Sequence, residues 1–163
     1  GETLGRNQAA RPFARLNSGY DGLPAAWAGF SFFGTSESVM PILNVQIMEG
    51  HSAAQKAALL KAASNAVVES IAAPLPSVRI VLQEVSAEHV IVGGEIGKAM
   101  ARVDVALISG RDEAKKAALI AALNQAVCAS IGISGQDVRV LLRDVPNTDM
   151  GAANGITAKA NGR

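Results

Sequence analysis

Residues 41–50 read Pro-Ile-Leu-Asn-Val-Gln-Ile-Met-Glu-Gly, and this stretch decides the fold because a variant of it returns sixty residues later. Residues 101–110 read Ala-Arg-Val-Asp-Val-Ala-Leu-Ile-Ser-Gly. When residues 41–100 are laid over residues 101–160 without a gap, 17 positions are identical. Self-similarity at a fixed period is the signature of an internal repeat. The chain is therefore a tandem duplication.

Strand-like segments open and close each repeat. Apolar side chains alternate with mixed ones over residues 43–47 and 103–107, as in a strand that buries one face. Segments rich in β-branched and other apolar residues run from 78 to 85 and from 138 to 145. Each repeat is therefore expected to end, as it begins, with a strand.

A helix is expected between the two strands of each repeat. Ser52 and Gln55 have the spacing of a capping box, and Asp112 can cap the second helix. Both segments carry an apolar residue at every fourth position, which gives one stripe for packing on a sheet. These residues are Leu59, Ala63, Val67 and Ile71 in the first repeat and Leu119, Leu123, Val127 and Ile131 in the second.

The order strand, helix, strand predicts parallel pairing of the two strands with a right-handed crossover. One unit of about 60 residues buries too little apolar surface to be stable alone, so the two copies are expected to pack together. The expected fold class is α/β, as a two-layer arrangement of the α+β type. Tandem β-α-β units form a four-stranded sheet with two helices on one face, and further oligomerisation is expected.

A break in composition falls at residue 40. All the aromatic residues precede Pro41, and the leader shows no persistent helical or strand period, so it is expected to be a poorly ordered extension. Because Met40 directly precedes Pro41, translation from Met40 is the simpler interpretation, with the leader upstream of the true start. The expected organisation is an extension (1–40), a first unit (41–100), a second unit (101–160) and a tail (161–163).

Charge and apolar content argue against several classes of function. Lys and Arg number 15 against 14 acidic residues, and this balance favours neither nucleic acid nor an anionic membrane as partner. No run approaches the ~20 apolar residues of a membrane span. The single Cys128 cannot form an internal disulfide, and His89 has no partner at metal-ligand spacing. A cytoplasmic protein without a metal site is expected.

Several short motifs occur together in the first repeat. They are Met-Pro at 40–41, a proline-containing helix exit at 74–76, Val-Arg at 78–79 and Gly-Gly-Glu at 93–95. In this register they closely resemble the 4-oxalocrotonate tautomerase family, over residues 41 to about 97 and again through the second copy. The chain is thus similar to a fused member of the tautomerase superfamily. The resemblance implies a cofactor-independent isomerase that interconverts keto and enol forms of a small unsaturated or α-keto carboxylic acid, assembled as a trimer of fused chains.

The resemblance also implies an amino-terminal catalytic proline, which is Pro41 once Met40 has been removed. Its free secondary amine acts as general base. A free α-amine titrates near pH ~8, and cationic neighbours and desolvation both lower its pKa toward neutrality. An internal proline cannot act in this way because its nitrogen is an amide. The structural alternative for Pro41 is a proline that merely opens a strand.

Two arginines hold the substrate's carboxylates in the family, one just after the first strand and one in the second strand. Arg79 and Arg139 match the second-strand position, whereas the post-strand position is His51 in the first copy and Arg111 in the second. Guanidinium offers a bidentate fork to a carboxylate and stabilises a developing enolate. A composite site of Pro41 with Arg111 is therefore expected, with His51 as a weaker substitute for arginine. The alternative for each arginine is a solvated surface position.

The second copy departs from the family's pattern. Ala101 occupies the proline position, so this copy is expected to act as scaffold and substrate contact. The family's aromatic residue near the site is absent, and Val90 and Met150 stand in its register.

Two other functions are left open by the sequence. One is a hydratase, dehalogenase or decarboxylase of the same superfamily, which would use a carboxylate to activate water; Glu49, Glu84 and Glu95 are available. The other is a non-catalytic subunit, which follows if residues 1–40 are retained, because the nitrogen of Pro41 is then acylated.

Overall fold

The computed structural model describes residues 40–162, so the expected extension lies outside the described residues except for Met40. The main elements are β1 (Ile42–Met48), α1 (Ala53–Ile71), β2 (Arg79–Val85), β3 (Ile91–Val92), β4 (Glu95–Ile96), β5 (Ala101–Ile108), α2 (Glu113–Ile131) and β6 (Val138–Val145). Short 3-10 turns lie at Leu75–Ser77, Ala87–His89, Gly135–Asp137 and Ala153–Gly155.

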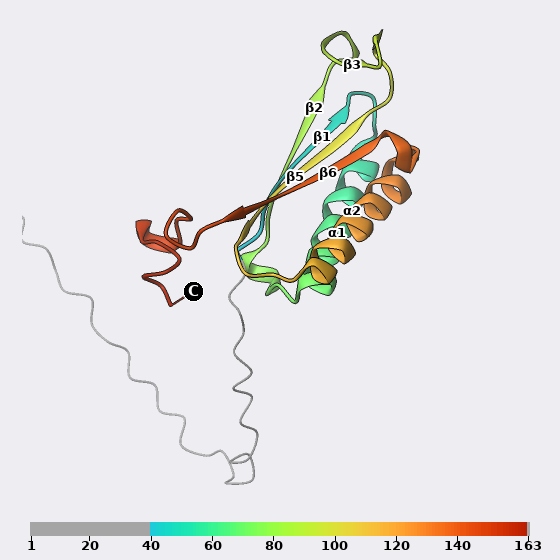
Figure 1. Ribbon diagram of the computed structural model, residues 1–163. Coiled ribbons are helices and arrows are strands. Elements are labelled where there is room, and N and C mark those ends of the chain that lie inside the picture. The colour runs from blue at the N-terminus through green and yellow to red at the C-terminus, as the bar shows by residue number, and fades with distance from the viewer. Residues whose placement is uncertain (1–39, 163) are drawn as a thin grey trace, which may run out of the picture. The chain divides into compact units, whose positions relative to one another are not determined.

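The main sheet has four strands in the order β2-β1-β5-β6. The strands within each repeat, β1 with β2 and β5 with β6, pair in parallel, whereas β1 and β5 pair antiparallel across the centre. Both helices lie side by side on one face of this sheet (Figure 1). The predicted two-layer fold of tandem β-α-β units is confirmed.

An approximate two-fold axis runs through the centre of the sheet. Asn44 and Asp104 face each other in the β1–β5 register, and they are also equivalent positions of the repeat. Because the pairing around them is antiparallel, the start of β1 lies beside the end of β5. The start of β5 likewise lies beside the end of β1, where Ala101 pairs with Ile47. This register decides which residues meet at each end of the sheet.

The helix caps form as the sequence predicts. The backbone N–H of Gln55 donates to Ser52 Oγ at 3.2 Å, and the backbone N–H of Ser52 donates to Gln55 Oε1 at 2.9 Å, which completes the capping box. Asp112 accepts from the backbone N–H of Lys115 at 2.7 Å. Gly132 ends α2 in the left-handed conformation at φ +72°, the conformation that glycine adopts without strain.

The core fills the layer between the sheet and the helices. Alternate residues of β1 and β5 point into it, and the apolar stripes of both helices are buried as predicted. Fully burying one such side chain contributes roughly 1.5–3 kcal/mol, so this layer is the main source of stability. Its largest buried side chains are Leu43, Val45, Ile47, Leu59, Val67, Val103, Val105, Leu107, Leu119, Leu123 and Val127.

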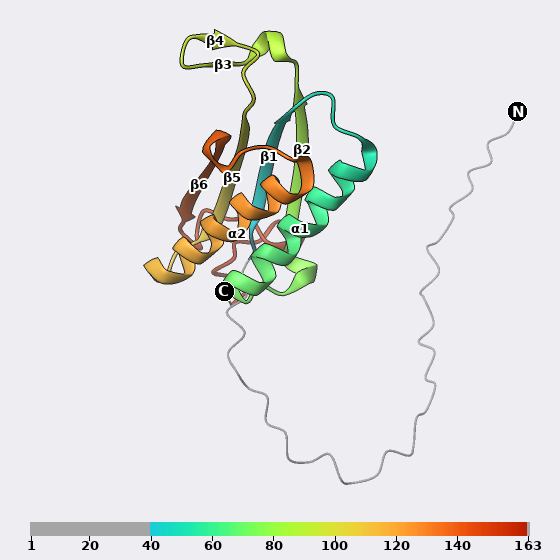
Figure 2. The ribbon, with the colours of Figure 1, turned by 90° about the vertical axis from the view of Figure 1, so that its right-hand side faces the viewer.

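Each repeat continues past its second strand, and the two continuations leave from opposite ends of the sheet (Figure 2). After β2 the chain forms the hairpin β3–β4, whose Gly93 and Gly94 have φ of +60° and +86°. This confirms the tight turn predicted there, since such φ values suit Gly-Gly in a two-residue hairpin loop. After β6 a single bridge joins Gly151 and Thr157.

Candidate active site

Pro41 lies directly before β1 and is buried. Its carbonyl accepts a hydrogen bond from the backbone N–H of Arg79 at 3.0 Å, and the next residue, Ile42, pairs with Arg79 in the parallel register. The first residue of β2 is therefore a direct neighbour of the proline. Two residues predicted for the site, from one copy of the repeat, lie together.

Arg111 comes from the other copy but belongs to the same end of the sheet. It follows β5 by three residues, and the pairing of Ile42 with Ala106 brings the end of β5 beside the start of β1. Its Nη1 donates to the carbonyl of Ile108 at 2.5 Å, and the side chain is half-buried. We call this end of the sheet, which carries Pro41, Arg79 and Arg111, the near end.

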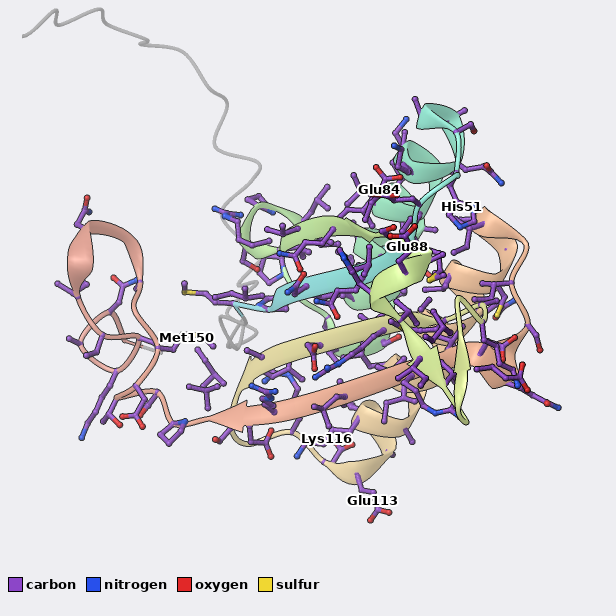
Figure 3. The ribbon with its side chains drawn as sticks, turned by 90° about the horizontal axis from the view of Figure 1, so that it is seen from above. His51, Glu84, Glu88, Glu113, Lys116 and Met150 are labelled. Carbon is purple, nitrogen blue, oxygen red and sulfur yellow. The ribbon has the colours of Figure 1, made fainter. Side chains whose placement is uncertain are left out.

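The equivalent residues of the opposite end are different. Ala101 takes the place of the proline and is fully buried, with Val138 as its partner on β6. His51 follows β1 there, and Figure 3 shows it at the end of the sheet opposite to Met150, which follows β6. Arg139 pairs with Arg102 in the β5–β6 register. We call this end of the sheet, which carries Ala101, His51 and Arg139, the far end. The predicted site residues are thus divided between the two ends.

The second-strand arginines have the same local geometry at both ends. Arg79 Nη1 donates to the carbonyls of Pro76 and Val78 at 2.6 and 3.0 Å. Arg139 Nη1 donates to the carbonyls of Gln136 and Val138, again at 2.6 and 3.0 Å. Both arginines are exposed. One nitrogen of each guanidinium is thus held by the turn before its strand, and its other N–H groups can meet an anion.

The residues in the register of the family's aromatic are both buried. Val90 is 6% exposed and Met150 is 5% exposed. Each follows the second strand of its own repeat, so Val90 belongs to the far end and Met150 to the near end. An apolar side chain therefore takes the aromatic's position at each end.

A cavity of about 720 Å³ lies at the far end, between the hairpin and the edges of β5 and β6. We call it the far-end pocket; its lining includes Val85, Ile91, Lys98, Met100, Arg102 and Arg139. A neighbouring cavity of about 520 Å³ includes His51 and shares Met100 with it.

Sequence reasoning missed Lys98 and Arg102 in this pocket. Alternation along β5 was enough to put Arg102 on the open face, away from the helices. Its pairing with Arg139 depends on the β5–β6 register, which follows from the equivalent pairing of Ile42 with Arg79 in the first copy. No comparable pattern marks Lys98, because the strand before it, β4, has two residues and is too short to show alternation.

Other kinds of site are not found in the described part of the chain. Within residues 40–162, no group of three or more His, Cys, Asp or Glu side chains gathers to hold a metal ion. In the same range no helix has the length and apolarity to cross a membrane. Cys128 is half-buried and packs against the core.

Comparison with known proteins identifies the family. The model of the Tautomerase enzyme family matches residues 41–100 and again residues 102–158. The chain belongs to the tautomerase family. Both copies of the repeat are thus tautomerase units, and the resemblance to a fused member of this superfamily is confirmed.

Relatives of this tautomerase include single-unit enzymes and fused chains. A 2-hydroxymuconate tautomerase of Stutzerimonas stutzeri is 43% identical over 63 residues, which is 39% of this chain and 100% of that protein. A solved fused 4-OT, described as a wild type symmetric trimer, is 65% identical with a TM-score of 0.74, covering 75% of this chain and 99% of its own.

A second solved structure, of Pt0534 inactivated by 2-oxo-3-pentynoate, is 43% identical. It has a TM-score of 0.74 and covers 75% of this chain and 99% of its own. These findings make the chain an enzyme, an isomerase of the 4-oxalocrotonate tautomerase type.

Proposed function

We propose that this tautomerase interconverts the keto and enol forms of a small unsaturated or α-keto carboxylic acid without a cofactor. Pro41 is the general base, and Arg79 and Arg111 bind the substrate's carboxylate groups. The curated relatives are named for 2-hydroxymuconate, so an unsaturated 2-hydroxy diacid of that kind is the substrate we propose to test first.

The observation that carries the proposal is the antiparallel register of β1 and β5. This register favours a composite site, because the end of β5, and with it Arg111, belongs to the same sheet end as Pro41. Arg79 is the neighbour of Pro41 on the other side, through the hydrogen bond to its carbonyl. One base and two guanidinium groups then belong to the same end of the sheet.

The proposed reaction moves one proton. The amine of Pro41 accepts the proton of the enol hydroxyl, and the electron pair of that O–H bond forms the carbonyl. The same nitrogen returns the proton to a carbon of the conjugated chain, so atoms and charges balance. An arginine beside the developing enolate stabilises its negative charge, and removing one such preorganised donor from an enzyme site typically costs about 10²–10³ in kcat.

This chemistry requires a free amine at Pro41. The peptide bond between Met40 and Pro41 must be cleaved, because an acylated nitrogen has no basic lone pair. Ala101 holds the equivalent position in the second copy and offers no such amine even in principle. One catalytic site per chain is therefore proposed, at the near end.

We also propose that three chains assemble as a trimer. The fused relative that is 65% identical was solved as a symmetric trimer. The face of the sheet away from the helices supports assembly, because apolar side chains remain exposed on it. On this face the side chains of Ile42, Val81 and Leu141 are 45%, 57% and 44% exposed.

The experiment compares two forms of the same chain, one cleaved between Met40 and Pro41 and one with the bond intact. Turnover of 2-hydroxymuconate is followed by absorbance, and the amino terminus of each form is verified by intact mass. We expect turnover only from the cleaved form. Equal turnover by the uncleaved form would rule out Pro41 as the base.

A further inference from the structure

We propose that the far-end pocket is a second binding site, which holds a small carboxylate through Arg139 and Lys98 and leaves it chemically unchanged. This site is separate from the proposed catalytic site at the near end. Its cavity is large enough for a ligand of the substrate's size, since ligand pockets commonly span ~300–1,000 Å³ and this one measures about 720 Å³.

The charges that face the pocket favour an anion. Arg139 has no carboxylate within 4.0 Å among residues 40–162, and its Nη1 is occupied only by backbone carbonyls. Lys98 makes one exposed contact of 4.0 Å with Glu95, which is too weak to neutralise it. Asp137 is the acidic residue of the lining. Two cations therefore remain for a ligand.

Arg102 contributes less charge than its position suggests. Its Nε and Nη2 lie 2.9 and 3.0 Å from the two carboxylate oxygens of Asp104, a bidentate pair. Such a pair largely satisfies both partners. We therefore assign the binding of the carboxylate to Arg139 and Lys98, with Arg102 as part of the wall.

The rest of the wall suits an apolar carbon chain. Val85, Val90 and Val92 line it from β2 and the hairpin, and Met100 closes it next to β5. A ligand with a charged end and a short unsaturated body fits this combination of surfaces.

The far end has no secondary amine in the position of the proposed base. Ala101 replaces proline, and it is fully buried in the core. The histidine that lines this pocket is His89, which precedes β3, whereas His51 lines the neighbouring cavity. The pocket thus keeps the arginine geometry of the near end without its amine, and this arrangement favours binding of a carboxylate without the proposed proline chemistry.

Calorimetric titration with muconate, the hexa-2,4-dienedioate ion, tests the proposal. Muconate lacks the hydroxyl group that tautomerises, so binding is measured without turnover. The titrations use the complete chain carrying Arg79→Ala and Arg111→Ala, which removes the near-end arginines. We expect one muconate per chain in this background. A titration without binding there would overturn the proposal.

Two matched substitutions on the hairpin then locate the site. Ile91 lines the pocket and is 65% exposed, whereas its strand partner Ile96 is 71% exposed and lies outside the lining. Ile91→Asp puts a negative charge beside the ligand and should weaken binding at least about tenfold. Ile96→Asp should change the affinity less than twofold. Equal effects of the two substitutions would contradict the assignment.

Arg139→Ala completes the test. It should weaken muconate binding at least about tenfold in the same background, as expected when a charged hydrogen-bond partner is removed. Unchanged affinity would overturn the role of Arg139. The result is independent of the proposed catalysis: if the near end binds no substrate, wild type and the double variant will simply bind muconate with the same stoichiometry.

Discussion

The two ends of the sheet are built from the same repeat but carry different residues at the predicted site positions. At the near end Pro41 lies with Arg111, and at the far end Ala101 lies with His51. One change, Ala101, is in the second copy, and the other, His51, is in the first copy. The antiparallel pairing places the start of each copy beside the end of the other copy's first strand. The changes at Ala101 and His51 therefore fall at the same end of the sheet.

At the proline and post-strand positions, the difference separates the two ends of the sheet and not the two copies of the repeat. The core positions stayed apolar in both copies, since the two-layer packing needs all of them. The second-strand arginines, Arg79 and Arg139, also kept the same hydrogen bonds. Among the predicted site positions, the proline position and the post-strand arginine position differ between the two copies.

The largest effect is expected from Pro41→Ala in the cleaved chain. Loss of the secondary amine should lower kcat for 2-hydroxymuconate by about 10²–10⁴, the range typical for removing a general base. Pro74→Ala is the matched control, because Pro74 lies in the turn after α1, outside the proposed site. Steady-state kinetics on both variants check this, and equal losses would contradict the role of Pro41.

Arg111→Ala and His51→Ala compare equivalent positions at the two ends. Arg111→Ala should lower kcat/KM by about 10²–10³, because a donor to the developing charge is lost. His51→Ala should change kcat/KM less than threefold if the far end takes no part in proton transfer. If the histidine variant is the more impaired of the two, the ends have been assigned the wrong way round.

Stability should respond equally at the two ends, in contrast to activity. Leu59→Ala and Leu119→Ala remove equivalent side chains that are both 0% exposed, so each should lower the free energy of unfolding by about 2–5 kcal/mol. Chemical denaturation of both variants measures this. A difference larger than the spread of such values would show that the two units do not share one core.

The helix caps provide the smallest comparison. Ser52→Ala and Asp112→Ala each remove a side-chain acceptor from the first turn of α1 or α2, and each should cost about 1 kcal/mol of unfolding free energy. Thermal denaturation followed by circular dichroism measures the shift. The carboxylate of Asp112 also interacts with the helix dipole, so its variant should show the larger salt dependence.

Much of the fold could be predicted because the same local patterns occur in both copies of the repeat. Alternation in the first strands, the capping box at Ser52 and the four-residue stripes are local patterns, and each one survives in the structure. The β3–β4 hairpin was foreseen only as a turn at Gly93 and Gly94, since strands of two residues are too short to show a period.

The candidate site was harder to derive from the chain. Repeat and resemblance together name Pro41, Arg79, Arg111, Arg139 and His51, and the departures from the family's pattern led to the expectation that Pro41 meets Arg111. Their meeting depends on the β1–β5 register, which is set by packing between the two units and has no local signal. The pocket at the far end needed the hairpin and β6 together, two segments far apart in sequence.

The central claim is that each chain carries one catalytic base, at the near end. Its most direct test is a titration of the cleaved wild-type chain with 2-oxo-3-pentynoate, the reagent that inactivated the relative Pt0534. Residual activity and the mass of labelled peptides are measured together. We expect one equivalent per chain to abolish activity, with the adduct on Pro41. Full inactivation with the label elsewhere, or activity that persists after Pro41 is labelled, would contradict it.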